Sequence, residues 1–151
     1  MGGVSIARSV AVVLVAWLLI AFIDQTLELV LVNAVGQGSV KDEASFLVVR
    51  NRPVVLTMTV MTHALASLLS GYLLGKLAGA NEVQHAIATA VFATIASAFA
   101  FVAPNVMLPP VWVRIAKLAI TPPALIAGAY VRGQARLVRA EQEREKADDT
   151  R

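Results

Sequence analysis

Long apolar stretches alternate with short polar segments along most of the chain. Each apolar stretch can form a helix that crosses the ~30 Å hydrocarbon core of a bilayer, which takes about 20 helical residues. Glycine, asparagine and proline gather in the polar segments, where they favour turns and helix ends. The pattern predicts an all-α fold, an integral membrane antiparallel four-helix transmembrane bundle in residues 1–135. The predicted helices cover residues 9–35, 53–78, 82–102 and 110–132.

Three features depart from this regular alternation. The short apolar stretch Phe46–Val49 falls in the first connection, and we expect it to lie along the membrane interface. Pro122-Pro123 falls inside the last predicted helix, where we expect a kink because proline lacks an N–H and its ring displaces the preceding turn. Residues 136–151 are strongly charged, so we expect a solvated cytoplasmic tail that can extend the last helix for a few turns before it frays.

The composition supports insertion into a membrane. Hydrophobic residues make up 58% of the chain and charged residues 15%, whereas soluble domains average about 45–50% apolar residues. The chain contains no cysteine, which excludes disulfides, thiolate metal sites and a cysteine nucleophile. The net charge of +3 comes mostly from segment ends, without a basic patch that interleaves with aromatic residues, so nucleic-acid binding is not expected.

The distribution of lysine and arginine indicates an orientation. Arg132, Arg136 and Arg139 follow directly on the last apolar stretch, and Arg8 precedes the first. Fewer lysines and arginines fall on the opposite side of the four predicted helices. Because cytoplasmic segments carry the excess of these residues, both termini are predicted to be cytoplasmic.

Two helices carry stripes of small residues at steps of four. Such stripes let two backbones approach closely in a membrane. A turn of only a few residues joins these two helices, so we expect the stripes to face each other as an intramolecular seam, with a homodimer interface as the alternative. The stripe in helix 53–78 is Ser67, Gly71, Gly75 and Gly79, and the stripe in helix 82–102 is Ala86, Ala90, Thr94 and Ala98.

Several short motifs lie between residues 57 and 132. They are Gly71–Gly79 with the sequence GYLLGKLAG, the pair His85-Ala86, the segment Pro109–Trp112 and the segment Pro123–Ala129. Together they resemble an uncharacterised family of small bacterial four-helix inner-membrane proteins with a G-Y-x-x-x-[KR]-x-A-G turn motif. The family has a further glycine where Ser70 stands here. The resemblance implies a bacterial inner-membrane protein and supplies no catalytic residues.

Two carboxylates fall inside the first predicted helix. Asp24 and Glu28 are four residues apart, so they share one helix face. Charges at such depth are costly in lipid and usually face the interior of a bundle. Measured from Arg8, Asp24 lies about 24 Å along the helix and Glu28 about 30 Å.

Basic partners lie at matching heights on other helices. Measured from Arg132 back along the last helix, Lys117 lies about 22 Å away and Arg114 about 27 Å. We therefore expect two ion pairs, Asp24 with Lys117 and Glu28 with Arg114. His63 lies about 20 Å from Lys76, which places it near Asp24. The candidate intramembrane polar cluster is Asp24, Glu28, His63, Arg114 and Lys117.

Two functions remain open for this cluster. The ion pairs can simply hold helices in register, which suits a non-enzymatic accessory or scaffold subunit with a membrane-protein partner or a second copy of the chain. Alternatively, Asp24, Glu28 and His63 serve a small proton- or cation-responsive transporter or channel-like protein. An enzyme is disfavoured because no G-x-S-x-G motif is present. No cofactor is expected, and the neighbouring cations Lys117 and Arg114 oppose a metal site.

Overall fold

The computed structural model describes residues 3–79, 81–102 and 108–149. This part of the chain is helical, without a strand, which confirms the all-α class predicted from the sequence. The helices are α1 (Gly3–Gly36), α2 (Glu43–Arg50), α3 (Pro53–Ala78), α4 (Glu82–Val102) and α5 (Val111–Asp149).

Three of the described helices are long and apolar enough to cross a membrane. The candidate spans are Ala7–Gly36 in α1, Pro53–Ala78 in α3 and Val111–Asp148 in α5. Large apolar side chains point outward from the helices, among them Phe22 at 70% exposure and Phe99 at 75%. An outward apolar surface of this kind is what lipid tails would cover, so the chain has the features of a multi-pass membrane protein.

Local sequence explains where the helices begin and end. Pro53 occupies the first turn of α3, where its missing N–H costs nothing. Gly79 ends α3 with a φ of 70°, a left-handed conformation that suits glycine, and Asn81 follows with a φ of 57°. These two residues belong to the short turn that reverses the chain between α3 and α4.

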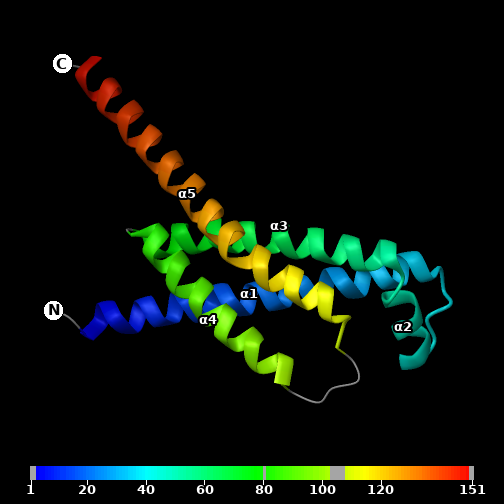
Figure 1. Ribbon diagram of the computed structural model, residues 1–151. Helices are drawn as coiled ribbons and strands as arrows, with labels where there is room; N and C mark the ends of the chain where they lie inside the picture. The colour runs from blue at the N-terminus through cyan, green and yellow to red at the C-terminus, as the bar shows by residue number, and fades with distance from the viewer. Residues whose placement is uncertain (1–2, 80, 103–107, 150–151) are drawn as a thin grey trace.

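The helices are arranged with the N-terminus and the α3–α4 turn at one end and α2 at the other (Figure 1). The most extensive contact joins α3 to α5, and α1 packs against α3 while α4 packs against α5. Three apolar clusters follow one another along α1. They centre on Val12 and Ala16, on Ile20, and on Val32. The face of α1 between the second and third clusters carries Asp24 and Glu28, so the core is interrupted there by charge.

The small-residue seam forms between α3 and α5. A Cβ at Gly71 of α3 would overlap the backbone carbonyl of Leu125 in α5, and a Cβ at Gly128 of α5 would overlap the carbonyl of Leu68. The two backbones therefore touch where each helix has a glycine, which is the closest approach that side chains permit.

The expected seam between α3 and α4 is therefore wrong in its partner. The prediction paired α3 with α4 because the two helices are neighbours in the sequence. The stripe of α4 consists of alanine and threonine, whereas α5 has Gly128, and a glycine allows the backbone of the facing helix to come closer. In α4, Ala86 is buried in a cluster with residues of α1, α3 and α5, and Ala90 is buried with residues of α1 and α5, while Thr94 is half-buried and Ala98 is exposed. In α3, Ser67 is fully buried, Gly75 lies against Arg132 of α5 and Glu82 of α4, and Gly79 is exposed near Arg8.

The last helix continues well past the predicted bounds of 110–132. Residues 110–132 account only for its first part, since α5 continues without a break through Pro122-Pro123 to Asp149. Figure 1 shows α5 changing direction between its yellow first part and its orange continuation, as a proline pair favours. Beyond the bundle, the charged segment predicted as a tail is an exposed helix as far as the structure describes it.

The glycine seam yields a test of stability. We expect Gly71→Ala and Gly128→Ala each to lower the unfolding free energy by roughly 1–3 kcal/mol, because the added methyl group would push the α3 and α5 backbones apart. Gly133→Ala is the matched control, since a Cβ added there would meet no other helix or side chain within 4 Å. That change should stabilise the helix by about 0.5–1 kcal/mol. Thermal unfolding in detergent measures all three, and equal effects would contradict the seam.

Candidate functional site

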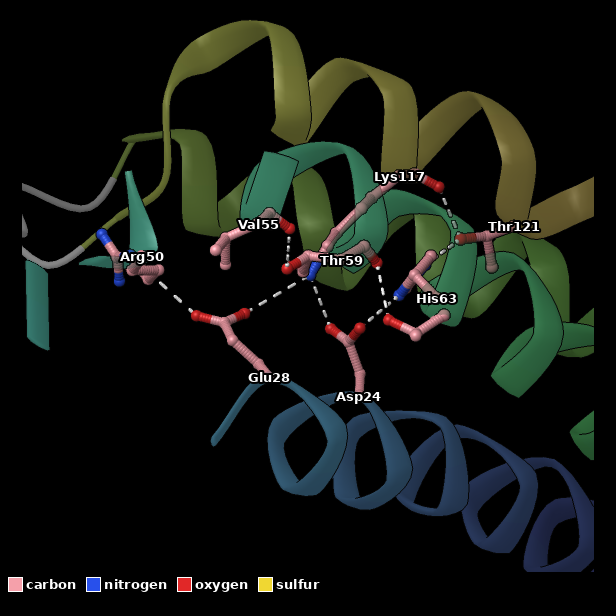
Figure 2. Close-up of polar contacts among 9 residues, drawn as sticks. Asp24, Glu28, Arg50, Val55, Thr59, His63, Lys117 and Thr121 are labelled. Carbon is pink, nitrogen blue, oxygen red and sulfur yellow. Dashed lines mark hydrogen bonds and ion pairs between the residues drawn. The ribbon is translucent and has the colours of Figure 1, made fainter. Parts of the chain in front are cut away.

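A row of ionisable side chains, basic and acidic in alternation, crosses the interior between two apolar clusters. In order they are Arg50 of α2, Glu28 of α1, Lys117 of α5, Asp24 of α1 and His63 of α3 (Figure 2). Each acidic side chain thus lies between two basic ones. Because an unpaired charge in an apolar interior is very costly, this alternation is what allows the row to be buried.

Asp24 is the centre of the row and is 8% exposed. Its Oδ2 accepts a hydrogen bond from Lys117 Nζ at 2.8 Å. Its Oδ1 lies 3.2 Å from His63 Nδ1, an ion-pair distance, and neither of these two atoms has a well-aligned hydrogen bond in the described chain. Lys117 Nζ also lies 3.8 Å from Glu28 Oε2. Three helices, α1, α3 and α5, therefore meet through one carboxylate.

Arg50 enters the row from α2 rather than from a long helix. Its Nε lies 4.0 Å from Glu28 Oε1, and its side chain is 7% exposed. Val49 beside it packs with Val32 of α1 and Val55 of α3. The apolar stretch predicted to lie along the interface thus forms the second half of α2 and anchors the helix on the bundle.

A capping box fixes the start of α2. The Ser45 N–H donates to Asp42 Oδ1 at 2.8 Å, and the Asp42 N–H donates to Ser45 Oγ at 3.1 Å. The backbone hydrogen bond from Ser45, with a second from its hydroxyl, holds the pKa of Asp42 below its usual range. The ionised form of Asp42 is therefore the one that stabilises α2.

His63 is joined to α5 through a threonine. His63 Nε2 lies 2.8 Å from Thr121 Oγ1, and Thr121 Oγ1 donates to the Lys117 carbonyl at 2.7 Å. A hydroxyl has one proton, so with that proton on the carbonyl Thr121 can only accept from His63. Nε2 then carries a proton. The contact between Nδ1 and the Asp24 carboxylate requires a second proton, either on Nδ1 or on Asp24. The geometry therefore corresponds to a doubly protonated imidazole, or to a neutral one beside a protonated Asp24.

A single rotation gives the alternative state. If the Thr121 hydroxyl turns from the Lys117 carbonyl to His63 Nε2, the ring keeps only its Nδ1 proton, directed at Asp24. The Lys117 carbonyl still has its helical partner, the N–H of Thr121. His63 can thus gain or lose one proton on Nε2 while Nε2 and the Thr121 hydroxyl keep each other as hydrogen-bond partners in both states.

The cluster opens onto a cavity of about 370 Å³. Asp24, His63, Lys117 and Thr121 line it, and so does Arg114. The expected ion pair of Glu28 with Arg114 is replaced as the principal contact by those with Arg50 and Lys117. Within the described ranges, no three His, Asp or Glu side chains gather as a metal site would require.

Sequence reasoning brought Asp24, His63 and Lys117 together from helical rise alone, and missed two members. Arg50 was not included in the candidate cluster, although it directly follows the apolar stretch that buries α2. Thr121 follows Lys117 by one helical turn, so its position was visible, but threonine is common in membrane helices and gave no signal.

No protein-family model, curated protein or solved structure matches the chain.

The capping box can be tested by amide exchange. We expect Asp42→Ala to raise hydrogen exchange throughout α2, because it removes the acceptor for the Ser45 N–H. Glu43→Ala, one residue later, leaves the box intact and should change exchange little. In the unmodified protein the stabilisation is complete above the ordinary aspartate pKa and is lost as the pH falls through the lowered folded pKa. If hydrogen exchange in α2 changes neither in Asp42→Ala nor at acidic pH, this account would be contradicted.

The Thr121 hydroxyl can be tested with an isosteric change. We expect Thr121→Val to lower the unfolding free energy by about 1–3 kcal/mol, because a buried ring nitrogen of His63 loses its partner. Thr57→Val is the matched control: Thr57 also bonds a carbonyl one turn earlier, that of Pro53, but it is exposed. Its effect should stay within about 0.5 kcal/mol. Thermal unfolding compares the two, and equal losses would show that His63 does not depend on Thr121.

Proposed function

We propose that this chain is a non-enzymatic, four-span bacterial inner-membrane protein that responds to protonation of His63, as a small transporter or channel-like protein. Three helices with the length and apolar character of spans support the membrane setting. The fourth proposed span is α4, whose 21 residues are long enough to cross a bilayer and which contacts α1, α3 and α5. The positive residues beside α5 support cytoplasmic termini.

The single observation behind the proton response is the chain from Asp24 through His63 to Thr121. Histidine titrates nearest to physiological pH of all side chains. In this arrangement Nε2 has Thr121 as its hydrogen-bond partner in both protonation states, which differ by the rotation of one hydroxyl. An ionisable group deep in a membrane protein is by default a candidate for function rather than for packing.

Protonation of His63 would change the strength with which the helices hold one another. A charged imidazole attracts Asp24 more strongly, and Asp24 is also the partner of Lys117. Lys117 in turn lies near Glu28, whose other partner is Arg50 of α2. A single proton therefore alters the balance of attraction at four helices, α1, α2, α3 and α5, and the cavity gives water a place beside the titrating pair.

A second candidate is the accessory or scaffold subunit, and one observation favours it. The continuation of α5 projects beyond the other helices as an exposed, highly charged helix (Figure 1). Such a helix has no core of its own to stabilise it, and a membrane-protein partner or a second copy of the chain would provide one.

Proton flux into proteoliposomes tests the first proposal. We expect the unmodified protein to carry protons down a pH gradient, read with a trapped pH-sensitive dye. Asp24→Asn should abolish this flux, because an uncharged asparagine cannot stabilise the imidazolium. Glu141→Gln, an exposed carboxylate of the α5 continuation, is the matched control and should leave flux unchanged. Both variants are first checked for folding by thermal unfolding.

The opposite results are equally informative. Flux that survives Asp24→Asn would remove Asp24 from the pathway. If the unmodified protein carries no protons and Asp24→Asn only lowers the thermal stability, the cluster is a structural ion-pair network. The accessory-subunit proposal would then be the better one.

A further inference from the structure

A groove of about 480 Å³ lies between α1 and α4, toward the end of the bundle that holds the N-terminus and the α3–α4 turn. The two helices cross at an angle, so they separate on one side of their contact (Figure 1). Val10, Val13 and Leu14 form the wall of the groove on α1. Ala88 and Phe92 form its wall on α4. In a membrane, apolar walls of this kind fit the acyl chain of a lipid.

The polar part of the described lining lies at the end nearest the α3–α4 turn. There Ser9 and His85 join α1 to α4, because Ser9 Oγ lies 3.0 Å from His85 Nε2. His85 Nδ1 lies 3.0 Å from the Asn81 carbonyl, which can only accept, so Nδ1 carries a proton. From Gln84 to Phe92 the groove follows α4 for about 12 Å, within the ~15 Å of hydrocarbon in one leaflet. A molecule with a polar head and an apolar chain suits both parts.

Arg8 brings positive charge to the polar end of the groove. It directly precedes Ser9, it is exposed, and its Nη2 donates to the Leu77 carbonyl at 3.1 Å. A guanidinium has five N–H groups, and a carbonyl carries no charge. The contact with Leu77 therefore holds the Arg8 side chain at the end of α3 without neutralising it.

Three further cations belong to the same end of the bundle. Lys76 is exposed in the last turn of α3, and Arg132 of α5 packs against the glycine that precedes it. Arg136 pairs with Glu82, whose Oε1 lies 3.1 Å from Nη1. Among the described residues whose contacts place them here, Glu82 carries the one carboxylate, so positive charge is in excess. A basic cluster beside membrane helices attracts anionic lipid headgroups.

We propose that an anionic phospholipid binds in this groove, with its phosphate at Arg8 and an acyl chain between Val13 and Ala88. The lipid bridges α1 and α4. With both termini cytoplasmic, it belongs to the cytoplasmic leaflet, where anionic lipids give the membrane a negative surface potential. The inference rests on the proposed four-span arrangement, which places α4 in the membrane, and does not depend on the protonation of His63.

Lipid selectivity is measured with phospholipids brominated on an acyl chain, which quench the fluorescence of a tryptophan that they contact. Trp17 reports on the groove because its ring meets that of Phe92 edge to face, with centroids 5.5 Å apart. The full chain with Trp112→Phe is placed in phosphatidylcholine nanodiscs that contain brominated phosphatidylglycerol or brominated phosphatidylcholine. We expect the anionic lipid to quench Trp17 at a mole fraction about fivefold lower, the gain from one basic residue near the headgroup.

The second tryptophan provides the matched control. The chain has two tryptophans, and Trp112 is exposed near the start of α5, away from the α3–α4 turn (Figure 1). In a Trp17→Phe background, we expect Trp112 to distinguish the two lipids much less than Trp17 does. An equal preference at both tryptophans would indicate a general attraction of anionic lipid to the chain and would overturn the inference.

The headgroup contact is tested with a matched pair of arginine changes. Arg8→Gln should remove the preference of Trp17 for phosphatidylglycerol, because the cation nearest the groove is lost. Arg52→Gln is the control, since Arg52 is exposed, makes no side-chain cap and lies just before α3, at the other end of the bundle. It should leave the preference unchanged. A preference that survives Arg8→Gln would overturn the assignment of the phosphate to Arg8.

The acyl-chain contact is tested by filling the groove. Ala88 is exposed and lines the groove, so Ala88→Phe should lower the quenching of Trp17 by brominated phosphatidylglycerol several-fold. Ala98→Phe makes the same change at an exposed position of α4 outside the lining and should have little effect. Equal effects of the two variants would overturn the groove as the binding site.

Two outcomes separate this inference from the proposed function. Equal quenching of Trp17 by both lipids would overturn the anionic site and leave the four-span arrangement and the proton response in place. If Trp112 is quenched and Trp17 is quenched by neither lipid, the groove does not face lipid, and both the inference and the placing of α4 in the membrane fail. Proton flux is measured independently of either result.

Discussion

The burial of Asp24 constrains the rest of this structure. A carboxylate inside an apolar helical bundle must be matched by opposite charge and by hydrogen bonds, or the helices cannot close around it. Here the match comes from two sides, with Lys117 of α5 on one oxygen and His63 of α3 at the other. Each partner then brings its own requirement: Lys117 lies near Glu28, Glu28 near Arg50, and Arg50 depends on α2. The position of a short, capped helix is thus tied to one aspartate.

Helix packing supplies the geometry that this network needs. The α3 and α5 backbones come closest at Gly71 and Gly128. Thr121 lies about two turns before Gly128, and His63 lies about two turns before Gly71. The close contact of α3 and α5 at these glycines fixes how far apart His63 and Thr121 lie, about two turns away along each helix. The glycines therefore influence the polar site without touching it. The apolar clusters on either side of the row offer no other polar partners, so the acidic and basic side chains of the row pair with one another.

Much of this arrangement follows from one-dimensional rules, and the remainder depends on facts that a single sequence does not contain. The limits of α3 and α4 followed from proline, glycine and asparagine, and the meeting of Asp24 with Lys117 followed from helical rise. The seam was assigned to the wrong pair of helices because spacing shows which residues form a stripe, but not which helix lies against it. Arg50 was missed because a charge in a connection is usually solvated, and only the packing of Val49 draws it inward. The continuation of α5 was expected for only a few turns beyond residue 132, but α5 reaches Asp149 because polar composition alone does not end a helix.

The central claim is that His63 exchanges the proton on Nε2, on the Thr121 side, while its Nδ1 proton stays directed at Asp24. The chain has two histidines, so His85→Gln leaves His63 as the sole imidazole. Nitrogen-15 NMR of this histidine-labelled variant in bilayers, recorded over a pH titration, reports the protonation of each ring nitrogen separately. Our account predicts that Nε2 loses its proton as the pH rises while Nδ1 remains protonated. Loss of the Nδ1 proton with Nε2 still protonated, or a ring that never changes state, would contradict it.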